Sequence, residues 1–200
     1  MPSRAAYERE MIEAIVSHVG TVDPDGFPIV VPTLHARDGD HVYIHGSAAS
    51  PTLRRAGKAE LCLTASIVDG LVLARSAVHH SVNYRSVVVF GQAERLEAGE
   101  EKRRALQAFT EKLVPGRWAD VRPPTEQELK ATAVLRLPLE EASAKVRTGG
   151  PLDDEEDYEL PVWAGTVGLR LVAGDPLPDD RLLPGVERPD YVGELVRARG

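Results

Sequence analysis

Polar and apolar residues alternate along much of the first 150 positions, and Asp-Gly pairs interrupt the alternation three times. The pairs are Asp25-Gly26, Asp38-Gly39 and Asp69-Gly70, each between runs rich in β-branched residues. Asp-Gly favours the tight turns that join antiparallel strands. The pattern therefore predicts three consecutive β-hairpins. Residues 84–96 and 132–147 predict two further strands.

The segment before the first hairpin has a helical pattern instead. Apolar residues recur on one face at Tyr7, Met11, Ile15 and Val19. Ser3 stands where a helix N-cap is expected, and the period changes to two after Gly20. This pattern predicts a first helix that ends near Gly20.

Three more helices are predicted between the strands. Ser50 as N-cap and Pro51 at the first helical position start a helix of about two turns, which ends at Gly57. An apolar stripe between residues 100 and 113 predicts the second of these helices, and residues 125–131 predict a short third.

Together, these elements predict a mainly β protein. The expected fold is a six-stranded antiparallel barrel with flanking helices over residues 1–148. From residue 149 to residue 200 the chain is rich in proline, glycine and acids. This composition predicts an irregular C-terminal arm that packs on the barrel or on a partner subunit.

Charge and composition exclude several classes of protein. The net charge of −7 argues against a nucleic-acid partner, because phosphate backbones require a basic surface. The N-terminal segment is too charged for a signal peptide, and no apolar segment approaches the length of a membrane span. A cytoplasmic protein without a membrane partner is therefore expected. The single cysteine, Cys62, excludes an intramolecular disulfide and a cysteine-rich zinc site.

Acidic residues are absent from two windows, although the chain has 31 of them. The windows are residues 41–59 and 71–93. Their basic residues are His41, His45, Arg54, Arg55, Lys58, Arg75, His79, His80 and Arg85. Two acid-free, basic segments in an acidic protein predict a site for an anion.

The first window has the elements of a phosphate site. Ser47 and Ser50 can donate hydrogen bonds at the start of the predicted helix, where free backbone N–H groups also point outward. Arg54 or Lys58 would supply positive charge. The alternative, that these basic side chains form an ordinary solvated helix face, explains the window equally well.

The second window contains adjacent histidines and an arginine. If it forms a strand, His79 and His80 point to opposite faces and cannot chelate one metal ion together, so no metal site is predicted. Arg85, between Tyr84 and Ser86, suits a phosphate or a planar aromatic ligand, or else pairs with a surface carboxylate. No nucleophile with a paired base is recognisable, so no catalytic side chain is predicted and a bound cofactor would supply the chemistry.

The order of these segments carries a family resemblance. "GFPIVVPTLHARDGDHVYIHGSAAS", "AELCLTASIVDGLVLARSA" and "NYRSVVVFGQAERL" follow one another as in the pyridoxamine 5′-phosphate oxidase-like superfamily of FMN-binding split barrels. The chain looks most like the flavin-nucleotide-binding branch, which includes nitroimidazole-resistance reductases. "KVRTGGP" stands where true pyridoxamine phosphate oxidases have an Arg-x-His motif, so that substrate is not expected.

The resemblance implies an FMN-binding homodimer with sites at the subunit interface. It places His45, Gly46, Ser47 and Ser50 beside the FMN phosphate and ribityl chain, with Arg54 or Lys58 near the phosphate. The strand Asn83, Tyr84, Arg85 and Ser86 would lie along the same cofactor. Trp163 would cover the flavin from the partner chain or, alternatively, pin the arm onto the barrel.

Three functions follow as hypotheses. In the leading one, the protein is an FMN-dependent oxidoreductase that takes electrons from NADH or NADPH and reduces a small planar acceptor, such as a nitroaromatic, or has an activity related to pyridoxamine phosphate oxidation. In the second, it binds or senses flavin without turnover. The third is haem binding, with His79 or His80 as iron ligand.

Overall fold

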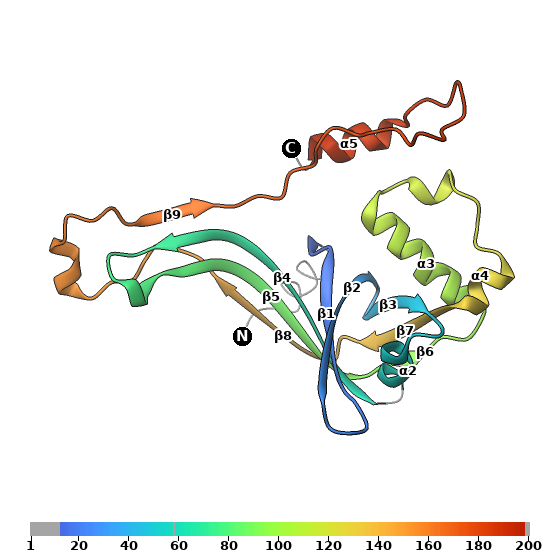
Figure 1. Ribbon diagram of the computed structural model, residues 1–200, viewed down its shortest axis with the longest axis horizontal. Coiled ribbons are helices and arrows are strands. Elements are labelled where there is room, and N and C mark those ends of the chain that lie inside the picture. The colour runs from blue at the N-terminus through green and yellow to red at the C-terminus, as the bar shows by residue number, and fades with distance from the viewer. Residues whose placement is uncertain (1–12, 58, 199–200) are drawn as a thin grey trace.

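The computed structural model describes residues 13–57 and 59–198, which form one curled antiparallel sheet with flanking helices (Figure 1). The strands are β1 (Val16–Val22), β2 (Pro28–Asp38), β3 (His41–Ser47), β4 (Glu60–Leu73), β5 (Ser81–Gln92), β6 (Glu94–Arg95), β7 (Thr132–Pro138), β8 (Glu141–Arg147) and β9 (Gly165–Gly168). The helices are α2 (Pro51–Ala56), α3 (Glu100–Leu113), α4 (Glu126–Ala131) and α5 (Asp190–Ala198).

The strand order is β6-β7-β3-β2-β1-β4-β5-β8, and β9 pairs with β4. Strand β2 joins two halves of the sheet, because Pro28–Leu34 pair with β1 and His35–Asp38 pair with β3. The mainly β fold class is confirmed. The described part of the chain has nine strands, where about six were expected.

Two apolar clusters lie on opposite faces of the sheet. The main core fills the inside of the curl and includes Val19, Ile44, Leu63, Val87, Val89 and Leu135. Helix α3 covers the other face of β2, β3 and β7, where Phe109 packs with Tyr43 and Val134. Both clusters follow from period-two strands, which expose alternate residues to each face.

The helix predictions in the middle of the chain are confirmed. Ser50 caps α2 by accepting a hydrogen bond from the Leu53 backbone N–H, and Gly57 follows its last residue. Helix α4 begins with a capping box between Thr125 and Glu128. These signals are local, so tertiary packing does not override them.

The first predicted helix was wrong over its last residues. Val16–Val22 form strand β1 at the centre of the sheet, between β2 and β4. Ser17, Val19 and Thr21 are buried on one face, so the period in this segment is two. The earlier part of that prediction, including Ser3, Tyr7 and Met11, lies outside the described residues.

Two other strand predictions were wrong in detail. Asp69-Gly70 does not form a turn, because β4 continues to Leu73 with a β-bulge between Val68 and Gly70. The segment 132–147 forms two strands instead of one. A break after Pro138 lets β7 pair with β3 while β8 pairs with β5.

The C-terminal arm contains more regular structure than its composition predicts. Strand β9 pairs with the outer end of β4, and α5 lies near α3 (Figure 1). The Tyr191 hydroxyl accepts a hydrogen bond from Arg117 at 2.7 Å and donates one to Asp120 at 2.6 Å. Contacts to β4 and to the segment after α3 therefore hold the arm over the sheet. The domain division at residue 148 and packing on a partner subunit stay predictions.

Gly70 allows the arm to approach β4, and this gives a test. A Cβ at Gly70 would lie 2.8 Å from the backbone oxygen of Val167, whereas one at Gly168 would meet nothing within 4 Å. Gly70→Ala is expected to separate β9 from β4 and to speed amide hydrogen exchange at residues 165–168 by roughly an order of magnitude. Gly168→Ala is the matched control. Equal exchange in the two variants would contradict the close-approach role.

Candidate functional site

The end of β3 and the start of α2 form the first predicted anion site. His45, Gly46 and Ser47 close the strand, and Ser50 caps the helix. Gly46 lets the strand lie close to Leu53, because a Cβ would lie 2.8 Å from Cδ1 of Leu53 and this side chain would have to shift. The structure therefore brings these four predicted residues into one turn.

Both serine hydroxyls in this turn already accept a backbone hydrogen bond. The Ala49 N–H donates to Ser47 Oγ at 3.2 Å, and the Leu53 N–H donates to Ser50 Oγ at 3.4 Å. A hydroxyl that accepts in this way keeps its own proton for donation. The turn can thus present two O–H donors to a phosphate. Arg54 is exposed on α2, and Lys58 lies outside the described residues.

His45 faces away from solvent, toward α3. Its ring lies 4.2 Å from the Phe109 ring, centroid to centroid, and burial lowers its pKa. Its buried Nδ1 has no hydrogen-bond partner among the described residues. A neutral imidazole results, which offers a polar atom rather than a charge to any ligand here.

Arg85 is held by carboxylates, as the alternative interpretation expected. Its Nε donates to Asp69 Oδ2 and its second guanidinium nitrogen to Asp69 Oδ1, both at 2.9 Å, and a third bond reaches Glu13. The window free of acids in sequence is thus not free of them in space, because β4 and the chain before β1 supply them.

The other predicted residues of β5 bind their neighbours in the sheet and in the arm. Asn83 donates to the Gly149 carbonyl at 3.0 Å and accepts from Arg147 at 2.6 Å. Tyr84 lies under the Lys145 ammonium group, 5.8 Å from the ring centroid, and Ser86 is opposite Ser66. Strands β2, β1 and β4 separate this segment from β3. Within one chain, the two acid-free windows therefore do not form one site.

The adjacent histidines lie before β5, in a 3₁₀ turn at Ala77–His79, so the strand-parity argument does not apply to them. His80 Nδ1 is 3.0 Å from the Ser76 carbonyl, while His79 Nδ1 lies 3.9 Å from Asp153 Oδ1. The two rings thus have different partners.

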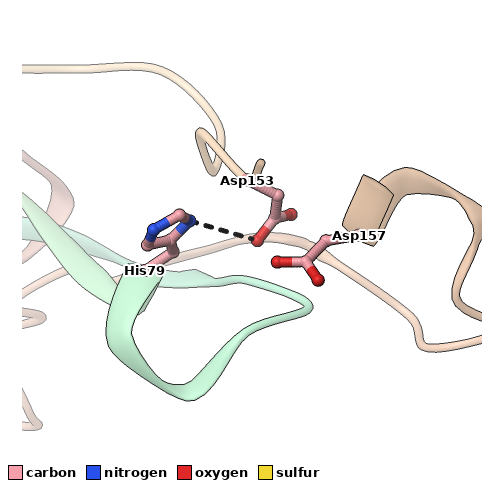
Figure 2. A group of neighbouring side chains, drawn as sticks. All are labelled: His79, Asp153 and Asp157. Atoms are coloured by element: carbon pink, nitrogen blue, oxygen red, sulfur yellow. Dashed lines mark ion pairs between the residues drawn. The ribbon is translucent and has the colours of Figure 1, made fainter. Parts of the chain in front are cut away.

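His79, Asp153 and Asp157 form a group whose candidate ligand atoms lie within 4.8 Å of one another (Figure 2). Asp153, with no exposed side-chain area, already accepts hydrogen bonds from the Arg75 backbone at 2.9 Å, the Arg75 guanidinium at 3.0 Å and the Ser76 backbone at 3.4 Å. Because the Asp153 carboxylate already binds Arg75, we do not interpret this group as a metal site. We interpret it as the contact that fastens the arm to the β4–β5 hairpin.

Trp163 is largely exposed. It lies in the arm just before β9, and 68% of its surface is accessible. The indole thus does not pin the arm onto the barrel of its own chain. Covering a flavin from a partner chain stays a prediction.

A large cleft, which the sequence did not indicate, lies between the sheet, α3 and the arm. Its volume is about 1380 Å³, above the roughly 300–1,000 Å³ typical of small-molecule sites. Its lining includes Val16, His18, Arg37, Ile67, Val68, Lys112, Leu169, Arg170 and Leu171. They come from separate segments, so no local pattern marks them. We call this space the arm-walled cleft.

Lys112 is the most perturbed cation in the arm-walled cleft. Its Nζ lies 2.7 Å from Nε2 of the fully buried His35, and burial lowers its pKa from 10.5 to about 7. Neither residue was predicted as part of a site. A lysine near its pKa at neutral pH can hold or release a proton beside a ligand.

The lowered pKa of Lys112 makes stability depend on pH. Between pH 7 and pH 10.5 the unfolded chain binds more protons at this site than the folded chain, so the free energy of unfolding rises with pH. Lys112→Met lacks this contribution. We expect its melting temperature relative to the wild type to fall by on the order of 10 °C between pH 7 and pH 10. Thermal unfolding measures this, and a difference that does not change with pH would contradict it.

The fold defines a class of protein. Two half-sheets that share β2, with a capped helix after β3 and a helix across the outer face, form a split barrel. The sequence profile of the pyridoxamine 5′-phosphate oxidase family matches residues 3–146. The chain belongs to this family of flavin-binding split barrels.

Solved structures extend the similarity beyond residue 146. The flavocytochrome Anf3 from Azotobacter vinelandii is 42% identical, with a TM-score of 0.91, over 96% of this chain and 89% of its own. The FAD and heme binding protein from Mycobacterium smegmatis is 34% identical, with a TM-score of 0.92, over 98% of this chain and 96% of its own.

A third structure matches less of the chain. The putative 5-nitroimidazole antibiotic resistance protein from Bacteroides thetaiotaomicron is 23% identical, with a TM-score of 0.59, over 72% of this chain and 84% of its own. It supports the fold alone. No curated protein matched the sequence. Among the described residues, no helix has the length and apolar character needed to cross a membrane, and the cytoplasmic location stays a prediction.

Proposed function

We propose that this protein is a redox protein that binds both a flavin and a haem. The observation that carries the proposal is the similarity of nearly the whole chain, arm included, to two proteins named for these cofactors. At 42% and 34% identity, the shared structure covers 96% and 98% of this chain. The proposal joins two hypotheses, flavin binding and haem binding, that the sequence left separate.

The turn between β3 and α2 would hold the flavin phosphate. Ser47 and Ser50 have O–H protons to donate, and Gly46 keeps the turn closely packed. FMN, as predicted from the sequence, and FAD both carry a phosphate at the end of the ribityl chain. One similar protein is described as an FAD and heme binding protein, so the test must distinguish FMN from FAD.

The flavin would lie between two copies of the chain. The segment Asn83–Ser86 and Trp163 are remote from Ser47 in the sheet, so they reach the same cofactor only from a partner subunit. Exposed apolar side chains along the arm, including Trp163 and Leu177, provide surface for such a homodimer.

The arm-walled cleft has the chemistry of a haem site. Aliphatic side chains from the sheet and from the arm line the cleft. Its lining also includes one histidine, His18, and arginines such as Arg170. Leu169, Arg170 and Leu171 belong to the arm, beyond the segment that the family profile matches. The residues present therefore fit an apolar macrocycle with anionic edges.

The cofactors would supply the electron transfer, and the chain would bind and orient them. Bound flavin would supply hydride transfer from NADH or NADPH, and bound haem would supply single-electron transfer. Ser47 and Ser50 would fix the phosphate, and Lys112 would hold or release a proton at Nζ beside the arm-walled cleft. The absence of a recognisable nucleophile and base agrees with this division of roles. The final acceptor would be small and planar, as the sequence predicted.

Titration of the cofactor-free protein tests the proposal. FMN, FAD and haemin are added separately, and binding is followed by flavin fluorescence quenching and haem absorption. We expect saturable binding of one flavin and one haem per chain. If the protein binds flavin but not haem, the haem part of the proposal is wrong and the flavin-only hypotheses remain. If it binds neither, the whole proposal is wrong.

A further inference from the structure

We propose that His18 is the axial ligand of the haem iron and that the haem lies in the arm-walled cleft. The inference rests on the proposed haem binding and adds the site and the ligand. Neutral imidazole is the commonest protein ligand of transition metals and the proximal ligand in many haem proteins.

The positions of the histidines single out His18. The chain has six histidines, and all lie within the described residues. Of these six, His18 lines the arm-walled cleft. His35 is fully buried against Lys112, and His45 packs on Phe109 beneath α3. His79 and His80 lie at the outer end of the β4–β5 hairpin, where the sequence had placed the haem ligand.

The strand that carries His18 is well suited to position a ligand. Strand β1 lies between β2 and β4, and residue 18 is paired on both sides, with Pro32 and with Thr64. A side chain on a central strand has a fixed backbone. His18 itself is exposed, and it makes no hydrogen bond or ion pair with the part of the chain that the structure describes. Its ring is therefore available to a ligand in the cleft.

The walls beside His18 are apolar surfaces that a planar group would cover. Val16 and Val68 on the sheet are 46% and 48% exposed, and Leu171 on the arm is 74% exposed. Burying such surface is favourable at about 25 cal/mol per Å². The sheet and the arm thus offer two apolar faces to the two sides of a macrocycle.

The charged groups around the arm-walled cleft also fit a ligand with carboxylates. Among the described residues, four cations line this cleft: Arg37, Arg85, Lys112 and Arg170. Two of the three acids in its lining, Asp69 and Glu13, bind Arg85. Glu111, the third acid in the cleft lining, accepts hydrogen bonds from the backbone N–H groups of residues 116 and 118. Arginine pairs well with carboxylates, so Arg170 on the arm is the expected partner of a haem propionate.

The test compares haem binding by full-length His18→Ala, His41→Ala and the wild type. Haemin titration is followed by the Soret band and by the electron paramagnetic resonance of the ferric iron. His18→Ala is expected to bind haem at least about tenfold more weakly and to lose the wild-type ferric signal, whereas the His41→Ala control keeps both. Added imidazole is expected to restore the signal to His18→Gly, because it fills the space of the lost side chain.

The outcomes separate this inference from the function on which it rests. If wild type and His18→Ala bind haem with the same affinity and the same ferric signal, His18 is not the ligand, although haem binding stands. If the wild type does not bind haem, the proposed function fails first. The melting temperature and flavin binding of each variant show whether it has folded. Recovery of the ferric signal with imidazole shows that His18→Gly has folded.

Discussion

Replacing Ser47 or Ser50 with alanine is expected to weaken flavin binding by about tenfold to a hundredfold for each hydroxyl removed. A hydrogen bond to a charged group contributes about 1.5–3 kcal/mol. Each hydroxyl accepts a backbone N–H and keeps a proton for the phosphate, so each variant loses one charge-assisted donor. Fluorescence titration with FMN and FAD measures the loss.

A change in flavin affinity must be separated from damage to α2, because Ser50 is its N-cap. Aspartate is as good an N-cap as serine but repels a phosphate. Ser50→Asp should therefore keep the melting temperature and still lose flavin binding. Ser143→Ala, exposed on β8, is the control that should change neither. Wild-type flavin affinity in Ser47→Ala and Ser50→Asp would rule out a phosphate site in this turn.

Replacing Asp153 with alanine is expected to release the first part of the C-terminal arm from the β4–β5 hairpin. The carboxylate accepts three hydrogen bonds from Arg75 and Ser76, and the substitution removes all of them. Limited proteolysis is expected to cut residues 150–160 at least roughly tenfold faster than in the wild type, because cleavage follows the population of the open form.

Asp157→Ala is the matched control, since Asp157 is a neighbouring carboxylate beside His79 in the same segment (Figure 2). Burial raises the pKa of Asp153, but the hydrogen bonds from Arg75 and Ser76 outweigh this effect and lower it. The stabilisation is thus present above the ordinary pKa of aspartate and lost as the pH falls through the lowered value. Equal cleavage of both variants at neutral pH would contradict the fastening role.

The sequence was most informative where the signals are local. Ser50, Pro51 and Gly57 predicted the bounds of α2, since capping depends on neighbours within one turn. It failed where tertiary contacts decide. Ile15 and Val19 fit a helical period, but pairing of β1 with β2 and β4 imposes a period of two. Asp69-Gly70 is a good turn signal, yet β4 continues through it with a bulge, where Arg85 binds Asp69 and β9 packs on Gly70.

The candidate site divides in the same way. The turn that holds Ser47 and Ser50 is contiguous in sequence, so its hydroxyl donors were predictable. The carboxylates that bind Arg85 come from other elements, and a window without acids gave no warning of them. The arm-walled cleft, with Lys112 over His35, had no signal at all, because its walls come from separate segments and the sequence does not show where the arm lies.

The most direct test of the central claim is the visible absorption spectrum of the purified full-length protein, before and after addition of NADH or NADPH. We predict a flavin band together with a Soret band, and the addition should bleach the flavin and shift the Soret band to that of reduced haem. A preparation that shows neither band, and gains neither when flavin and haemin are supplied, would contradict the account.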